Sequence, residues 1–305
     1  MGGHPLQLWG WGEVKSAHRW KAYRLLATDE AGETLGGAQV LQRPLPKPFG
    51  SMLYVPRGPV GDPAVILPAI ADYCRKNFTA THISVEPHQT SELDIKGWSR
   101  VQKALLLAQT IWIDLSKSED ELMVDMTKKT RQYIRKSSND GVSVRASTAD
   151  DFGAIMGIYK QTADRAGFGL HDQQYYLDIQ SMMGDSSRIF VAEAEGKVVA
   201  FAWLVVSKDI AFELYGGMNE QGQQKRANYC LKWHAITTLK GEGVRTYDVN
   251  GLLNDGVSTF KRGFADTEIT LAGTYDYRLS IWYPIWQHAF PIAKGLLQKM
   301  KALRK

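Results

Sequence analysis

The sequence predicts an α/β protein built of two domains, and three observations point to this. Strand-like apolar runs alternate with helix-like segments along the chain, the pattern of a layered α/β structure. A length of 305 residues is enough for two domains of ordinary size. The apolar fraction of 44% and the charged fraction of 23% are those of an ordinary globular protein.

The first domain is expected to comprise residues 1–110, completed by the C-terminal segment 273–305. Asp62 and Pro63 form a helix start, with aspartate as the cap and proline in the first turn, and this helix runs to about Asn77. The prolines between Pro44 and Pro48 require a loop. Strands are expected at residues 21–27 and 34–42, in a segment leading into Tyr54, and at residues 81–86 and 110–115.

The second domain is expected to comprise residues 111–272. Ser116 can cap a helix from Lys117 to about Ser138, with Glu119 as its capping-box partner. Asp172 caps another helix further on. The remaining elements are a strand at 142–146, a helix at 149–166, strands at 188–194, 198–206 and 210–215, a helix at 225–240 and a strand at 244–249. This order is that of an acetyltransferase-like GNAT unit, and the first domain is an abbreviated copy. The pattern therefore predicts the fold class α/β (α+β), and it agrees with two tandem GNAT-like (acyl-CoA N-acyltransferase-like) domains and a cleft between or beside them, the arrangement that the family resemblance given below implies.

Composition and motifs exclude several classes of protein. No apolar run approaches the roughly 20 residues that cross a bilayer, and the N-terminus lacks the pattern of a signal peptide. The two cysteines lie far apart and suit neither a disulfide framework nor a metal site, so we expect a cytoplasmic protein without a metal. No nucleophile elbow, zinc-protease motif or phosphate loop is present. The net charge of +5 is compatible with a phosphate-rich partner.

The stretch from Arg245 to Phe264 is the most informative part of the sequence. A short strand ends at Asn250-Gly251, a pair that tolerates positive φ, and a polar loop leads to a helical turn closed by Gly263. That turn carries Lys261 between aromatic residues. Such a construction holds one cation at the end of a strand.

Three motifs together carry a resemblance to a known family: Tyr215-Gly-Gly, Tyr-Asp-x-x-Gly at 247–251 and Phe-Lys-x-Gly-Phe at 260–264. With them the chain resembles the Fem family (FemABX) of non-ribosomal peptidyl transferases. These enzymes use aminoacyl-tRNA to add amino acids to the stem peptide of a peptidoglycan precursor. The resemblance implies no cofactor, aminoacyl-tRNA as co-substrate, and lipid II or UDP-MurNAc-pentapeptide as acceptor. No heptad run for a coiled-coil arm exists here, so the chain resembles the arm-less members.

The resemblance implies catalytic roles for Lys261 and Tyr215. Lys261 would offset negative charge in the transition state or hold the tRNA end, and the alternative is a surface ion pair. Tyr215 ends a strand before two glycines, where its hydroxyl would face a cleft. The alternative is a tyrosine of the core.

Four further residues match substrate-binding positions of the family. Lys15 and Arg165 would hold the diphosphate of the precursor; the alternatives are a solvated lysine on a surface strand and a favourable charge at a helix C-terminus. Arg57 would shape the cleft of the first domain or cap a turn. Glu86 would hold the incoming amine or form structural hydrogen bonds at a strand end.

Two charged segments suggest partners, and two other functions stay open. The basic helix Lys128–Lys136 would face tRNA, or form a solvated surface. The basic amphipathic segment after Pro291 would touch the inner membrane surface, close back on the first domain, or do both. An acyl-CoA N-acyltransferase would use the same fold, but the loop Gln221–Asn228 lacks the central glycine that a phosphate cradle needs. A non-catalytic RNA- or envelope-binding protein is the third possibility.

Overall fold

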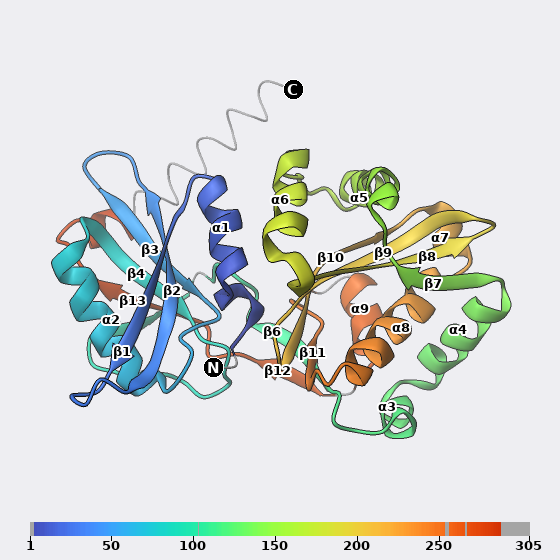
Figure 1. Cartoon of the computed structure of the whole chain (residues 1–305), viewed down its shortest axis with the longest axis horizontal. Helices are drawn as coiled ribbons and strands as arrows, with labels where there is room; N and C mark the ends of the chain where they lie inside the picture. Colours follow the sequence, from blue (N-terminus) through green and yellow to red (C-terminus); the bar gives the residue numbers. More distant parts are fainter. Residues whose placement is uncertain (1–2, 103, 254–255, 266, 288–305) are drawn as a thin grey trace. The chain divides into compact units, whose positions relative to one another are not determined.

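The computed structural model describes residues 3–102, 104–253, 256–265 and 267–287. Contacts divide these residues into two compact units, each with its own β-sheet (Figure 1). The first unit comprises residues 15–105 and 272–287, and the second comprises residues 3–14 and 106–271. The N-terminal residues were expected in the first domain but group with the second unit, because Leu6, Trp11 and Val14 are buried in its core.

The first unit is a six-stranded sheet with the order β1-β2-β3-β4-β13-β5. Only the β3–β4 pair is parallel among the pairs of this sheet. Helix α2 (Pro63–Asn77) begins at the predicted cap, where the Asp62 side chain accepts from the amide of Ala64, and it packs its apolar residues on the sheet. The strands are β1 (Lys21–Thr28), β2 (Thr34–Pro44), β3 (Ser51–Pro56), β4 (Ala80–Glu86), β5 (Trp98–Val101) and β13 (Thr274–Arg278).

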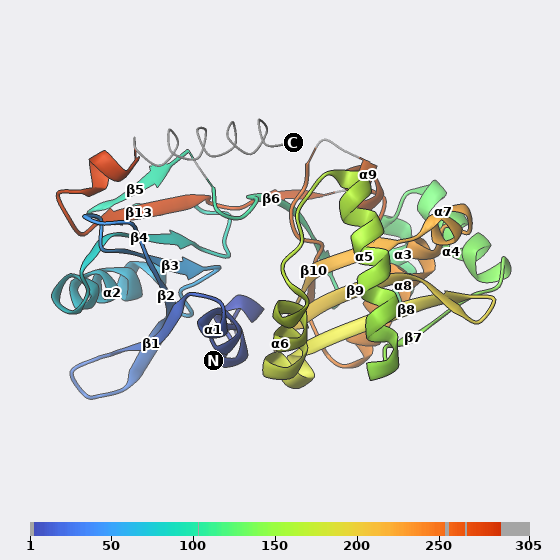
Figure 2. The same ribbon diagram turned by 90° about the horizontal axis from the view of Figure 1, so that it is seen from above.

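The second unit is a seven-stranded sheet with the order β12-β6-β11-β10-β9-β8-β7, in which only β10 and β11 pair in parallel. Its strands are β6 (Gln109–Asp114), β7 (Val142–Ala146), β8 (Ser187–Ala194), β9 (Lys197–Val206), β10 (Ile210–Met218), β11 (Thr246–Asp248) and β12 (Glu268–Thr270). Helices α5 (Phe152–Ala166) and α6 (Gln173–Met183) cover one face, whereas α4 (Lys128–Asn139), α8 (Ala227–Gly241) and α9 (Gly256–Arg262) lie on the other (Figure 2). Two separate hydrophobic clusters therefore fill the two faces.

Shorter elements complete the two units. Helix α1 (Trp9–Ala17) contains the boundary between them. The others are α3 (Glu119–Asp125), α7 (Glu220–Gln224) and the 3₁₀ turns η1 (Pro5–Gln7), η2 (Ala149–Asp151) and η3 (Gly184–Ser186). Among the described residues, no helix combines the length and the apolar character of a membrane span.

The helix expected from Lys117 to Ser138 is two helices, so this prediction is wrong. The cap of α3 is Ser118, and Glu121 completes its capping box, two residues later than predicted. The backbone is extended at the buried Met126, and the Thr127 side chain then caps α4 by accepting from the amide of Thr130. A second cap inside a continuous helical pattern allows the chain to turn there.

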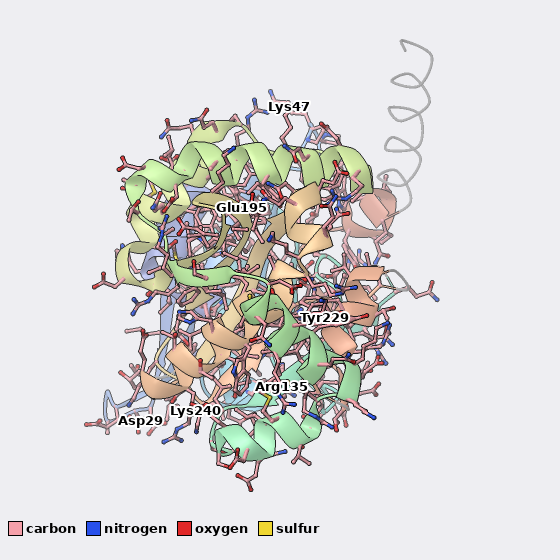
Figure 3. The ribbon with its side chains drawn as sticks, turned by 90° about the vertical axis from the view of Figure 1, so that its right-hand side faces the viewer. Asp29, Lys47, Arg135, Glu195, Tyr229 and Lys240 are labelled. Atoms are coloured by element: carbon pink, nitrogen blue, oxygen red, sulfur yellow. The ribbon has the colours of Figure 1, made fainter. Side chains whose placement is uncertain are left out.

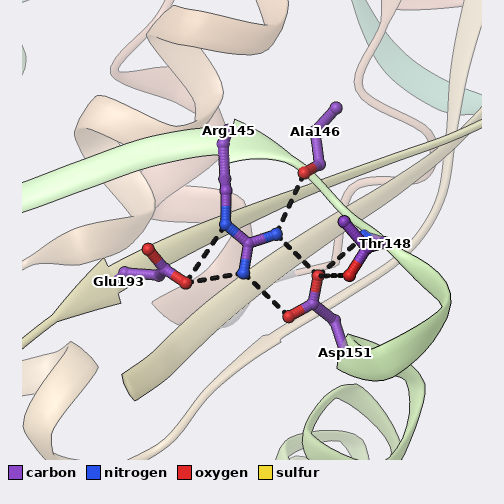
Figure 4. A network of polar contacts seen from close by, with 5 residues as sticks. All are labelled: Arg145, Ala146, Thr148, Asp151 and Glu193. Atoms are coloured by element: carbon purple, nitrogen blue, oxygen red, sulfur yellow. Dashed lines mark hydrogen bonds and ion pairs between the residues drawn. The ribbon is translucent and has the colours of Figure 1, made fainter. Parts of the chain in front are cut away.

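A polar network fixes the start of α5 (Figure 4). The Arg145 guanidinium on β7 donates to both oxygens of Asp151, at 2.6 and 2.8 Å, and to Oε1 of Glu193 on β8, at 2.6 Å. Asp151 also accepts from the amide of Thr148 at 2.7 Å. Hydrogen bonding by Arg145 holds the pKa of the Asp151 carboxyl well below its usual range. The network thereby ties α5 to the sheet.

Candidate functional site

Lys261 is held by the turn that follows β11. Asn250 and Gly251 both have left-handed backbone angles, with φ of +53° and +47°, as the Asn-Gly pair predicts. The carbonyl oxygens of the turn point to the lysine: Nζ donates to Asn250 and, at 2.9 Å, to Gly251. The ammonium of a short helix is thus fixed at the end of a strand, as the sequence indicated.

Asp248 anchors this turn in the sheet. Its carboxylate is 1% exposed and accepts from the Thr110 hydroxyl at 2.5 Å, the Trp112 indole at 3.0 Å and the amide of Asn250 at 2.8 Å. The last of these bonds shapes the turn whose carbonyls hold Lys261. Sequence reasoning included Asp248 in a motif but gave it no role.

Gly263 explains why the motif ends in a glycine. Its carbonyl accepts from the amide of Thr127 at 3.0 Å, so α9 lies directly on the start of α4. A Cβ at position 263 would stand 2.2 Å from the hydroxyl oxygen of Thr130, closer than real contacts allow. The glycine therefore fits the close approach of Thr130 and is not needed for its backbone angle, since Gly263 is not among the residues with positive φ.

The aromatic residues beside Lys261 pack against α8. The rings of Phe260 and Phe264 lie 5.2 Å apart, and the ring of Tyr229 lies 4.9 Å from Phe260. Behind them lies Lys232, a buried lysine that sequence reasoning missed and that pairs with Glu213. The available signal was a lysine within an otherwise apolar helical stretch.

Tyr215 lies in an aromatic cluster on the opposite face of the same sheet. Its ring is 5.3 Å from Tyr159, 5.5 Å from Tyr176 and 6.0 Å from Trp203. Burial raises the pKa of the Tyr215 phenol well above its ordinary value, so the hydroxyl keeps its proton at neutral pH. This environment favours the core-tyrosine alternative, and the structure places Tyr215 and Lys261 in different layers.

Glu86 and Arg57 lie near each other in the first unit, around Tyr54. Glu86 is 1% exposed and accepts from the Tyr54 hydroxyl, from the Thr274 hydroxyl at 2.6 Å and from the amide of Leu105 at 2.7 Å. Arg57 is buried with a φ of +52°, and its charge acts on Tyr54. Three hydrogen bonds favour the structural role for Glu86.

Lys15 lies in the last turn of α1 and not on a strand. The alternative of a solvated lysine on a surface strand is therefore wrong. Burial lowers the pKa of its ammonium to about 8, and the charge of Arg43 adds to the effect. Because its surroundings disfavour the charged form, the Lys15 ammonium would be stabilised strongly by an anionic ligand.

Arg165 is exposed in the last turn of α5, near the end of β10. Its guanidinium donates to the carbonyl oxygen of Met218 at 3.2 Å. With the amide oxygen of Gln223 turned toward it, Nη1 also donates there at 2.6 Å. Arg165 therefore has the favourable position at a helix C-terminus, and hydrogen bonds to Met218 and Gln223 also orient its guanidinium.

The loop Gln221–Asn228 contains a helical turn where a coenzyme A cradle would need open backbone amides. Helix α7 occupies its first part, and Arg226 then adopts a left-handed conformation, with φ of +53°, before α8. The Lys225 ammonium donates to the carbonyl oxygen of Asp140 at 3.0 Å. The loop therefore offers side chains and a short helix in place of a glycine nest.

The cations of the basic helix α4, among them Arg135 (Figure 3), differ in their contacts. Arg131 caps α3 by donating to the carbonyl oxygens of Met123 and Met126, at 2.9 and 2.5 Å. Lys128 and Arg135 are exposed and line a shallow hollow on this helix. Only part of the basic cluster is therefore available to a partner. The basic segment predicted after Pro291 lies outside the described residues.

The sequence is similar to those of several known proteins. A sequence model of the FemAB family matches residues 99–198. A Staphylococcus epidermidis protein named lipid II:glycine glycyltransferase is 23% identical over 390 aligned residues, which cover 98% of this chain and 93% of that protein. Its namesake from Staphylococcus aureus is 26% identical over 220 residues, covering 64% of this chain and 51% of that protein.

The solved structure of FemX shares the fold. It aligns with a TM-score of 0.83 and 20% identity over 94% of both chains. Two sheet-centred units and the likeness to FemX confirm the predicted α/β architecture with two domains. The chain is thus similar to the FemAB family over residues 99–198, to lipid II:glycine glycyltransferase along nearly all of its length, and to FemX in fold.

Proposed function

We propose that this protein is an aminoacyltransferase of peptidoglycan synthesis. It moves an amino acid from aminoacyl-tRNA to the stem-peptide amine of lipid II or UDP-MurNAc-pentapeptide, as a step in building the interpeptide bridge. The observation that carries the proposal is the ammonium of Lys261, fixed on two carbonyl oxygens at the end of β11 in a relative of lipid II:glycine glycyltransferases.

The reaction needs positioning and charge more than a nucleophile. The ester of an aminoacyl-tRNA is already activated, and the acceptor amine must lose a proton because its ordinary pKa is near 10.4. The amine nitrogen attacks the ester carbonyl carbon, the carbonyl oxygen gains negative charge, and the bond to the ribose oxygen then breaks. The amine proton passes to that ribose oxygen, with the substrate assisting the transfer.

Lys261 is the residue proposed to act on the reacting atoms. A fixed positive charge near the developing oxyanion stabilises the transition state more than the ground state. Tyr215, as a protonated phenol in an aromatic cluster, would support the shape of the site and would not remove a proton. No cofactor besides the aminoacyl-tRNA co-substrate enters this proposal.

The remaining predicted residues are assigned to substrates. Lys15 and Arg165 would each bind phosphate of the precursor, and Arg57 with Glu86 would shape the first unit. The exposed Lys128 and Arg135 would contact the tRNA backbone, where phosphate contacts dominate affinity. Peripheral contact with the inner membrane surface through the C-terminal basic segment is also proposed; it agrees with exposed apolar residues just before that segment, including Ile281 and Ile285.

One experiment tests the proposal directly. The purified protein is incubated with a mixture of charged tRNAs and lipid II, and in parallel with UDP-MurNAc-pentapeptide, and the products are identified by mass spectrometry. We expect the precursor to gain the mass of one or more amino-acid residues. A product mass that never changes with any charged tRNA would contradict the proposal.

A further inference from the structure

A buried ion pair connects three elements of the second unit behind the candidate site. Lys232 on α8 is 4% exposed, and its ammonium pairs with the carboxylate of Glu213 on β10. The same Oε1 of Glu213 accepts from the Tyr247 hydroxyl on β11 at 2.6 Å. Charges this deeply buried persist only when they are paired and hydrogen-bonded.

The ammonium of Lys232 also lies among three aromatic rings. It is 5.1 Å from the ring centre of Phe260, 5.5 Å from that of Phe264 and 5.7 Å from that of Tyr247. Distances within about 6 Å are those of cation–π attraction. Phe260 and Phe264 stand on either side of Lys261 in the sequence, so the buried cation contacts both flanks of the candidate catalytic residue.

A bulge in β10 separates the face of Glu213 from that of Tyr215. The register between β10 and β9 shifts between Glu213 and Tyr215. In a regular strand these two side chains would share a face, but the bulge sends Tyr215 into the aromatic cluster with α5 and α6. Bulges are common next to active sites, where they redirect a side chain.

We propose that the Lys232–Glu213 pair positions α9, and thereby Lys261, for the transfer reaction. Both are positioning residues, because they act through Phe260 and Phe264 and not on the substrate. The inference rests on the proposed function. A buried ion pair is often no more stabilising than apolar residues of similar size, so stability alone gives little reason to keep one here.

The main test is a double variant, Lys232→Met with Glu213→Gln. It removes both charges together and leaves an amide oxygen that accepts from the Tyr247 hydroxyl, so the fold is expected to persist. We expect kcat for transfer to fall at least tenfold, while KM for precursor and charged tRNA stays within about threefold. Glu213→Gln alone keeps the shape of the side chain but leaves the Lys232 ammonium buried without its carboxylate, so this second variant should lose more stability than the double variant and lower kcat at least as much.

A second measurement reads the position of α9 without activity. Amide hydrogen exchange of residues 256–262 should quicken in the double variant, whereas exchange in α5 stays as in the wild type. The matched control is Arg145→Met with Glu193→Gln, which breaks another charged network of the same unit, far along the sheet order from β11. This control should lose stability but keep the kcat of the folded protein.

The outcomes separate the two proposals. Wild-type kcat and wild-type exchange of α9 in both the double variant and Glu213→Gln would overturn the positioning role. A wild-type protein that transfers nothing would overturn the proposed function. In that case amide exchange still tests whether the ion pair fixes α9.

Discussion

Replacing Lys261 by methionine should nearly abolish transfer while the protein stays folded. The substitution keeps the length of the side chain and removes its hydrogen bonds to the carbonyl oxygens of Asn250 and Gly251. A hydrogen bond to a charged group contributes about 1.5–3 kcal/mol when buried. Because Lys261 is only partly buried and water can reach the turn, we expect a net loss of about 1–3 kcal/mol in unfolding free energy. A domain of ordinary stability tolerates that loss.

The loss in rate should be larger than the loss in stability suggests. Removing one group that stabilises a developing oxyanion costs about 10²–10³-fold in kcat, or about 2.7–4 kcal/mol of transition-state energy. Urea unfolding first establishes that the variant is folded, and steady-state transfer from charged tRNA to the precursor then gives kcat and KM.

Arg262→Met is the matched control for this prediction. Arg262 is the next residue on α9, and its guanidinium forms an ion pair with Glu268 at 2.7 Å. A pair this exposed contributes only about 0–1 kcal/mol, so both stability and kcat should stay near those of the wild type. Turnover of Lys261→Met close to the wild-type value would refute the reasoning, as would an equal loss in the control.

Five further predictions concern the α7 loop and the other assigned residues. Acetyl-CoA should bind weakly or not at all because the α7 loop lacks a glycine nest, and calorimetry that gives a micromolar Kd would reverse this. Lys15→Met should weaken precursor binding about tenfold or more. The same substitution should raise the unfolding free energy at pH 7 by as much as about 3 kcal/mol. The reason is that the pKa of Lys15 is about 8 in the folded protein and 10.5 ordinarily, so folding disfavours the charged form. For the same reason the wild type should gain stability as pH rises from about 8 to 10.5, because in this range Lys15 is protonated in the unfolded state and largely neutral in the folded state. An unfolding free energy that does not change over this pH range would contradict the prediction. Charge reversal of Lys128 and Arg135 should raise KM for charged tRNA and flatten its salt dependence, with KM for the precursor unchanged. Tyr215→Phe should keep most of kcat, and a hundredfold loss would restore a catalytic role for the hydroxyl.

Local sequence signals predicted much of the fold because their causes are local. Asp62 and Asp172 each cap the helix that they were expected to cap. The Asn250-Gly251 pair forms the left-handed turn that its residue types favour. The alternating order of strands and helices was sufficient to predict the two-unit architecture, because that order can be read from the hydrophobic pattern along the chain.

Features that depend on distant contacts were not predictable in the same way. Lys232 and Glu213 are 19 residues apart and become a pair only when β10 and α8 stack. The break at Met126 also involves a distant contact, because the amide of Thr127, the cap of α4, donates to the carbonyl oxygen of Gly263. The burial of Lys15 likewise arises from tertiary packing, although its place after two tryptophans was visible in the sequence.

The bulge in β10 links these two kinds of feature in one strand. Without the extra residue, Glu213 and Tyr215 would point to the same face, and both family-matched positions, Tyr215 and Lys261, would share one layer. With it, the carboxylate at 213 faces α8 and α9, and the phenol at 215 packs with α5 and α6. One strand thereby holds the ion pair behind Lys261 on one face and closes the aromatic core on the other. The chemistry assigned to Lys261 consequently depends on Glu213, a residue that carries no motif, more directly than on Tyr215, which does.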